Sequence, residues 1–285
     1  MIRSVTINDS LTLSNDSSSA IWLSMIDGIH EPPRRSTEVS YSDRSGGSVP
    51  KQLYGPRVIQ LQGGIDGGSC ASNSQNRSDF IEAMPLDVYV PIRFNMSDGR
   101  QLETSVKFTS VNMPISSIYN TDWNVIAVAK DYRLSDVSGV GGASVTLDQA
   151  IAGGWREYSS AGWREYSGDG WREYPSIGQV NAVNTGSYPA EQTIRIYGIV
   201  QNPVIYNYST GELFKVNITT SSADDVILID TAGKYTTLNG GNINALVDDS
   251  STYFSLQPGD NLLQLVAESG DGYAVSTYYA TYVGA

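Results

Sequence analysis

The sequence has very little of the two residue types that zinc sites and many catalytic sites use. Its 285 residues include one cysteine, Cys70, and one histidine, His30. A lone cysteine cannot form an internal disulfide, and one histidine with one cysteine cannot supply the usual four ligands of a zinc site. We therefore expect a chain that folds in a reducing compartment and that needs no metal or other cofactor.

Catalytic motifs are missing as well. His30 lies in GIHEPPRR beside two prolines, and no Gly-x-Ser-x-Gly turn accompanies it, so we interpret it as a surface loop residue. No Gly-Lys-Ser/Thr phosphate loop is present, and the glycines at 139–142 open no helical pattern, which argues against a nucleotide site. The adjacent carboxylates at 224–225 and 248–249 would point to opposite faces of a strand. We expect them to aid solubility at loop ends, and we predict that the protein is not an enzyme.

Long apolar runs and an excess of basic residues are also absent. No segment approaches the roughly 20 apolar residues of a membrane helix. The first residues lead directly into an alternating pattern, so we expect no secretory signal and synthesis in the cytosol. The chain has 18 basic against 30 acidic residues, a net charge of -12. This excess of acidic residues argues against sequence-independent binding of nucleic acid, and we also expect no sequence-specific nucleic acid partner.

Short alternating segments separated by turn residues are abundant. This pattern predicts an all-β protein built of two β-sandwich domains. Only Arg77–Met84 resembles a helix, with Ser74 or Asn76 near its start and Pro85 ending it. Asp98–Gly99 predicts a hairpin turn. The strands expected in the first half are Ser4–Leu13, Ile21–Ile26, Thr37–Tyr41, Val58–Gly64, Leu86–Phe94, Gln101–Asn112 and Asn124–Lys130.

A Gly/Ser-rich stretch, Ser135–Ser144, follows the last of these strands. Such composition is typical of a junction between domains. We therefore predict an amino-terminal domain at residues 1–134 and a carboxy-terminal domain at residues 135–285.

Three near-identical units, GWREYSSA, GWREYSGD and GWREYPSI, begin at Gly154, Gly162 and Gly170 and form an insertion at residues 153–176. Each unit fits a short strand closed by a turn, with the tryptophans stacked on one side and the Arg/Glu pairs in water. Two interpretations stay open: a duplicated strand that decorates the second domain, or an exposed contact arm. The candidate partner or glycan contacts are Trp155, Arg156, Tyr158, Trp163, Arg164, Tyr166, Trp171, Arg172 and Tyr174.

The segment after the repeats combines turn residues with alternation. Thr193–Val200 alternates as a half-buried strand does, and a second alternating run ends in a turn at 209–211. Similar patterns occur in residues 226–283, and Tyr54-Gly-Pro-Arg57 precedes the alternating run VIQLQGGI. The turn residues in the first of these matches are Asn184, Gly186, Pro189, Gly198, Asn202, Pro203, Thr210, Gly211 and Glu212.

In these three ordered matches the sequence resembles the distal tail proteins of long-tailed bacteriophages, a siphovirus-type tail component family. The resemblance implies an amino-terminal ring-forming sandwich and a galectin-like carboxy-terminal sandwich. It implies a structural virion protein at the tail tip or baseplate, a homohexameric hub with a DNA channel, which contacts the tail tube protein and tail-tip hub or fibre proteins.

The WREY repeats depart from the family pattern. They keep a second hypothesis open, a carbohydrate-binding protein that recognises host cell-surface glycans by aromatic stacking.

Overall fold

A computed structural model describes most of the chain as two compact units. The first unit consists of Met1–Ser138 and Tyr282–Ala285, and the second of Gly139–Thr281. For residues 39–40, 47–48, 143–151 and the strands between 156 and 174, only the backbone is described. The described residues are 1–15, 19–36, 39–40, 47–48, 52–114, 117, 119–138, 143–151, 156–159, 162–167, 170–174 and 179–285.

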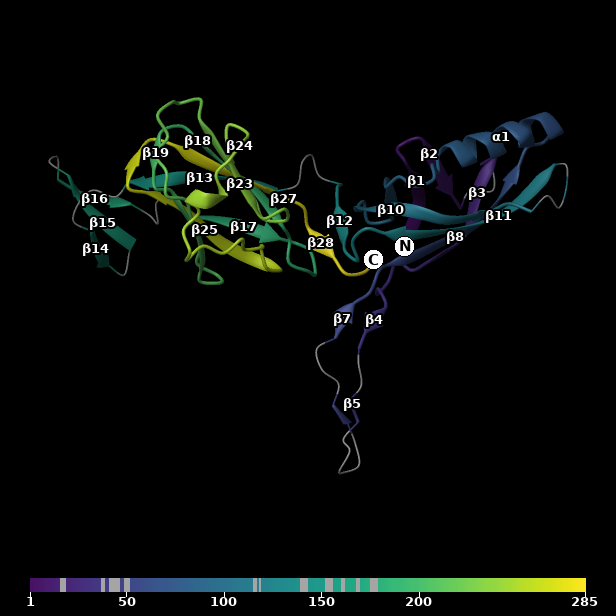
Figure 1. The fold of residues 1–285 in the computed structure, drawn as a ribbon, viewed down its shortest axis with the longest axis horizontal. Helices are drawn as coiled ribbons and strands as arrows, with labels where there is room; N and C mark the ends of the chain where they lie inside the picture. The colour runs from purple at the N-terminus through teal and green to yellow at the C-terminus, as the bar shows by residue number, and fades with distance from the viewer. Residues whose placement is uncertain are drawn as a thin grey trace. The chain divides into compact units, whose positions relative to one another are not determined.

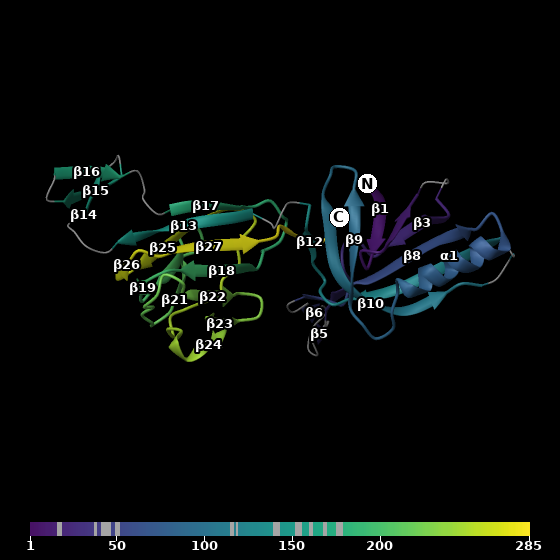
Figure 2. The ribbon, with the colours of Figure 1, turned by 90° about the horizontal axis from the view of Figure 1, so that it is seen from above.

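The first unit is built on one β-sheet that closes on itself. Among the described residues the strand order is β11-β8-β3-β2-β1-β9-β10-β12-β28, and β10 also pairs with β11, which completes the circuit. Helix α1 (Cys70–Glu82) lies over this sheet (Figures 1 and 2). The strands are β1 (Ile2–Ile7), β2 (Leu11–Ser14), β3 (Ile21–Asp27), β8 (Val58–Asp66), β9 (Val90–Met96), β10 (Gln101–Asn112), β11 (Asn120–Ala129), β12 (Leu134–Asp136) and β28 (Thr281–Tyr282).

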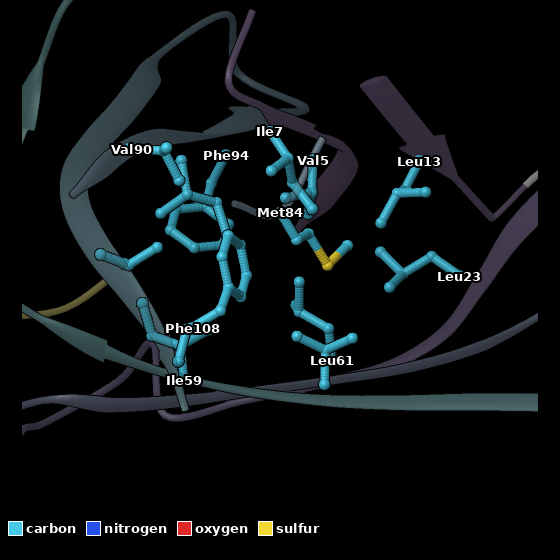
Figure 3. Packing of buried hydrophobic residues seen from close by; sticks show 14 of the residues in the cluster. Val5, Ile7, Leu13, Leu23, Ile59, Leu61, Met84, Val90, Phe94 and Phe108 are labelled. Carbon is cyan, nitrogen blue, oxygen red and sulfur yellow. The ribbon is translucent and has the colours of Figure 1, made fainter. Parts of the chain in front are cut away.

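Alternation along these strands creates the core of the first unit. In β9 every second residue is buried, as expected for a strand with one face against the interior. Helix α1 adds Phe80, whose ring lies 4.8 Å from that of Trp123 on β11. Figure 3 shows the packing of core residues that include Val5, Ile7, Leu13, Leu23, Ile59, Leu61, Met84, Val90, Phe94 and Phe108.

Two adjacent glycines in β8 make room for two tryptophans. A Cβ at Gly63 would lie 2.5 Å from the ring of Trp123, and one at Gly64 would lie 2.5 Å from the ring of Trp22. Both distances are shorter than a real side chain tolerates. The Gly-Gly step in the VIQLQGGI run is therefore a packing requirement, because any larger residue would displace an indole ring.

Several of the predicted element boundaries in this unit are wrong: the strand predicted from Asn124 begins at Asn120, and three further differences have a local cause. Ser4–Leu13 is not one strand but the hairpin of β1 and β2, because Asn8 and Asp9 take positive φ angles of 51° and 50° and turn the chain. The predicted strand from Leu86 begins at Val90, since Asp87 has a φ of 62° and interrupts extended backbone.

The third concerns the helix, which starts earlier than Arg77. Ser69 is the N-cap, and its hydroxyl accepts a hydrogen bond from the backbone N–H of Ser72 at 3.1 Å. The first helical residues, CASNSQN, include two serines and two asparagines, which favour caps and turns, and they carry no apolar repeat, so the sequence pattern gave no sign of a helix there. The predicted hairpin turn at Asp98–Gly99 is confirmed, with Gly99 at a φ of 93° between β9 and β10.

Short strand pairs complete the first unit. β4 (Arg34–Arg35) pairs with β7 (Leu53–Tyr54), and β5 (Val39–Ser40) pairs with β6 (Gly47–Ser48). The predicted strand Thr37–Tyr41 lies partly outside the described residues, and β5 is the part that the structure describes.

The second unit contains two strand ladders joined by β13. The first six residues of β13 pair antiparallel with β27, and its last three pair parallel with β25. Figure 2 shows β13 beside β27. The strands are β13 (Ala143–Ile151), β17 (Gln179–Asn184), β18 (Gln192–Tyr197), β19 (Val200–Gln201), β20 (Val204–Asn207), β21 (Glu212–Lys215), β22 (Val226–Asp230), β23 (Tyr235–Leu238), β24 (Gly241–Asn242), β25 (Gly259–Ala267), β26 (Ser269–Gly270) and β27 (Tyr273–Tyr278), with the 3-10 helix η1 (Asn244–Leu246).

One core lies between these ladders. Ile194 and Ile227 face it from the β27-β18-β22 side, and Ile205, Phe214 and Leu265 face it from the β21-β20-β25 side. The predicted hairpin at 209–211 is confirmed as β20 and β21, and Gly211 has a φ of 75° there. The predicted strand to Val200 ends at Tyr197, because Gly198 has a φ of 91°.

Candidate interaction surfaces

The WREY repeats form a small antiparallel sheet. It consists of β14 (Arg156–Ser159), β15 (Gly162–Ser167) and β16 (Gly170–Tyr174), side by side in Figure 1. The chain enters from β13 and returns through β17, and both of these strands pair with β25. The repeats are therefore an insertion between two strands that are neighbours of the same strand.

The register of this sheet matches opposite residue types. Arg164 stands opposite Glu157 on one side and opposite Glu173 on the other. Trp163 stands opposite Tyr158 and Tyr174. Of the remaining predicted contacts, Arg156 and Arg172 both stand opposite Glu165, and Tyr166 stands opposite Trp171, whereas Trp155 lies outside the described residues.

The expectation that the tryptophans stack on one side is wrong. Trp171 is three residues before Tyr174, the register partner of Trp163. Positions an odd number apart belong to opposite faces of a strand. Trp163 and Trp171 therefore occupy register positions on different faces, and each is aligned with tyrosine rather than with tryptophan.

A second candidate surface lies on the outward face of β18 and β27. The rings of Tyr197 and Tyr273 stack with centroids 5.1 Å apart, and Tyr273 is 46% exposed. Arg195 lies in the next row of this face, opposite Val275 and Leu228, which are half-buried. Tyrosine and arginine are among the residue types that contribute most to binding at protein interfaces, so this face is a candidate binding surface.

The carboxylate pairs organise turns. Asp225 accepts hydrogen bonds from the backbone N–H groups of Ser221 at 2.9 Å and Ser222 at 3.0 Å, and from the Asn239 amide at 2.9 Å. These bonds, the one from Asn239 first, lower the pKa of Asp225. Asp248 has a lowered pKa for the same reason, with the bond from the Ser250 hydroxyl as the largest cause. These carboxylates thus have a structural role beyond the predicted solubility.

The described residues offer no cluster for metal binding. Within the described ranges, no group of three or more His, Cys, Asp and Glu residues could hold a metal ion. His30 is exposed, and its Nδ1 lies 3.2 Å from the carbonyl oxygen of Ala285. Among the helices that the structure describes, none has the length and apolar character needed to cross a membrane.

Among the residues whose side chains the structure describes, Arg57 is the most buried charged residue, with no exposed surface. Its guanidinium donates to the carbonyl oxygens of Gly28 at 2.7 Å, Ile29 at 2.8 Å and Tyr132 at 2.8 Å, and also to that of Val283. Burial lowers the pKa of Arg57, and nearby Asp131 opposes this effect. Arg57 holds three distant segments of the first unit together, so it is a structural residue and not a free contact.

The carboxy-terminal part of the chain matches a known protein family. Residues 185–282 fit the family model for the C-terminal domain of the siphovirus-type tail component. We call these matched residues, 185–282, the tail component domain. The resemblance predicted from the turn motifs is confirmed here, whereas no curated protein matches the chain in sequence.

Solved structures share the fold of the whole chain. The crystal structure of the Dit (gp 19.1) protein of phage SPP1, described as a paradigm of the hub adsorption apparatus in phages that infect Gram-positive bacteria, matches with a TM-score of 0.66. It has 13% identity and covers 98% of each chain. Chains of the phage P2 baseplate in its activated conformation with Ca and with Sr match with TM-scores of 0.52, at 13% and 12% identity. They cover 97% of this chain and 98% of theirs.

The motif residues of the tail component domain are structural. Asn184 donates to the carbonyl oxygens of Tyr188 at 2.9 Å and Leu256 at 3.0 Å and accepts from the N–H of Gly186 at 2.9 Å. Asn202 takes a φ of 46° before Pro203, a conformation that asparagine tolerates. The motif therefore marks the turns of this domain rather than a binding site.

Sequence reasoning missed the role of Arg57 and the surface around Arg195. Arg57 was visible only as the start of a strand, because its partners at 28–30, 132 and 283 are far away in the sequence. Arg195 and Tyr273 come from strands that pair only in the folded tail component domain. The available signal was the alternation of Arg195 and Tyr197, which places both side chains on one face of β18.

Proposed function

We propose that the chain is a structural virion protein, the distal tail hub that joins a phage tail tube to baseplate or tail-tip proteins. The observation that carries this proposal is the fold match over 98% of both chains to a protein described as part of a hub adsorption apparatus. The tail component domain at residues 185–282 supports it from sequence. On this proposal the protein catalyses no reaction and is located at the tail tip, after synthesis in the bacterial host cytoplasm.

The two units take different roles in the proposed hub. The amino-terminal domain, with proposed limits 1–134, assembles a homohexameric ring through heterologous contacts around a closed axis. The carboxy-terminal galectin-like domain, 135–285, docks fibre or other tail-associated proteins, while the ring abuts the tail tube protein. A net charge of -12 suits a channel through which DNA passes, because few cations are available to retain phosphates.

Size exclusion with light scattering tests the ring over a concentration series. We expect a species of six times the 30.8 kDa chain mass and, by electron microscopy, rings with a central opening. A monomer at every concentration would overturn the self-assembling ring. Failure of an antibody against the chain to label the tail tips of phage particles would overturn the hub itself.

A second candidate function is recognition of a host cell-surface glycan. The stack of half-buried Tyr197 with exposed Tyr273 beside Arg195 favours it, because sugar rings pack on aromatic faces and hydrogen-bond to arginine. Binding of the chain to purified cell-wall polysaccharide, lost in Tyr273→Ala and in Trp163→Ala, is the expected result. Binding that both variants retain, or no binding by the native chain, would eliminate this function.

A further inference from the structure

The WREY motif is complementary to itself when two copies run antiparallel. In the pairing of β14 with β15 the order of residues gives Arg156 opposite Glu165 and Glu157 opposite Arg164. The pairing of β15 with β16 repeats this register, with β15 as the shared strand and β16 as a further copy of the motif. Two hairpins that share β15 thus follow one rule, in which Arg stands opposite Glu and Trp stands opposite Tyr.

The repeat sheet leaves two outer strands. Among the described residues the strand order is β14-β15-β16, so β14 and β16 each have one edge without a strand partner. An edge strand presents a row of backbone N–H and C=O groups that can pair with another strand. Both edges carry the same Arg-Glu-Tyr sequence that already pairs with β15 inside the sheet.

The order of charges limits which strand can be added at these edges. Opposite charges directly across an antiparallel pair stabilise it, and like charges destabilise it. A further WREY strand in the same register again places Arg opposite Glu in both charged rows. A strand with the order Trp-Glu-Arg-Tyr has the same composition but places Arg opposite Arg and Glu opposite Glu.

We propose that the repeat sheet is a contact between two copies of this chain, in which outer WREY strands pair antiparallel in the register of the internal hairpins. The partner is fixed by the observations, because the motif that complements the edge is present in the chain itself. The proposal does not rest on the hub function, since the proposed ring uses the first unit.

The test uses the full chain and two peptide probes of equal composition. One probe has the sequence of residues 162–174, GWREYSGDGWREY, and the other is GWERYSGDGWERY. A full-length variant in which Arg and Glu are exchanged within each repeat, called the swapped variant, retains Arg opposite Glu in every internal row. Its outer strands then carry the order Trp-Glu-Arg-Tyr. Its substitutions are Arg156→Glu, Glu157→Arg, Arg164→Glu, Glu165→Arg, Arg172→Glu and Glu173→Arg.

We expect each chain to bind the probe of its own order at least about tenfold more tightly than the other probe, measured by fluorescence anisotropy. A full chain that lacks residues 153–176 should bind neither probe. Equal affinity of both probes for both chains, or binding to the shortened chain, would overturn the proposal. The proposal would also be overturned if the repeat sheet bound cell-wall glycan and neither peptide probe. The shortened chain keeps the first unit, so whether it forms a ring tests the proposed hub separately from the repeat contact.

Discussion

Single polar side chains hold many of the turns of this protein. Asn261 is fully buried at the end of the turn LQPGDN, residues 256–261, and donates to the carbonyl oxygens of Gln257 at 2.7 Å and Gly259 at 3.1 Å. Asn184 does the same for the preceding turn motif. Each asparagine side chain supplies hydrogen bonds to backbone groups that have no backbone partner in the turn. A buried polar group without a partner would destabilise the fold.

Asp225 predicts a specific pH dependence at this scale. Its pKa is lowered in the folded state, so it stabilises the fold above the ordinary aspartate pKa of about 3.9, and this stabilisation is lost as the pH falls through the lowered value. Asp225→Asn should therefore lower the melting temperature at pH 7, and the difference from the native chain should shrink below about pH 4.

Asp224→Asn is the control for that measurement, because the Asp224 carboxylate accepts no hydrogen bond from any described residue. It should melt as the native chain does at pH 7. A melting difference for Asp225→Asn that persists unchanged in acid would contradict the assignment of the effect to the charged carboxylate.

At the scale of elements, local signals predicted the hairpins better than the partners of each strand. Gly99, after Asp98, and Gly211 identify turns because both positions take positive φ angles, which favour glycine and which the local sequence therefore reveals. The pairing of β18 with β22 and β27 joins residues 192–197 to 226–230 and 273–278, and nothing in the local pattern specifies such partners. The repeat register was not predicted because identical units admit several alignments.

Gly186 tests the close approach of two elements in the second unit. A Cβ at this position would lie 2.2 Å from the carbonyl oxygen of Thr281, a backbone atom that cannot rotate away. Gly186→Ala should therefore destabilise the second unit by about 1–3 kcal/mol in denaturant unfolding. Gly241→Ala, whose nearest contact would be Leu238 O at 3.4 Å, is the matched control and should change stability little. Equal effects of the two substitutions would show that the contact is not tight.

At the scale of the whole molecule, the sequence predicted an all-β chain with a division near the Gly/Ser-rich stretch, but not the position of the last residues. The compact units divide after Ser138, and Tyr282–Ala285 belong to the first unit. No composition shift marks this return. Arg57 explains it physically, because its guanidinium donates to Val283 and to segments near residues 29 and 132.

Arg57→Met should weaken the first unit as a whole. The substitution leaves several buried carbonyl oxygens without donors, and loss of one partner of a buried charged network costs about 3–5 kcal/mol. Hydrogen exchange should show faster exchange at Ala285, whose N–H bonds to Ile29 O at 3.3 Å, while the core of the second unit keeps its protection.

Arg93→Met provides the comparison within the same unit. Arg93 is partly exposed and pairs with Glu103 at 2.7 Å, so its loss should cost less than about 1 kcal/mol. If Arg57→Met were no more destabilising than Arg93→Met, the structural role assigned to Arg57 would be wrong.

The position of β28 has a consequence for biosynthesis. β28 extends the sheet of the first unit beside β12, yet it follows residues 139–280 in the chain. A ribosome that adds about 5–20 residues per second needs on the order of ten seconds to translate the intervening unit. During that interval Arg57 has no Val283 carbonyl to bind. The first unit to leave the ribosome is thus the last to be completed, and the second unit can fold in the meantime.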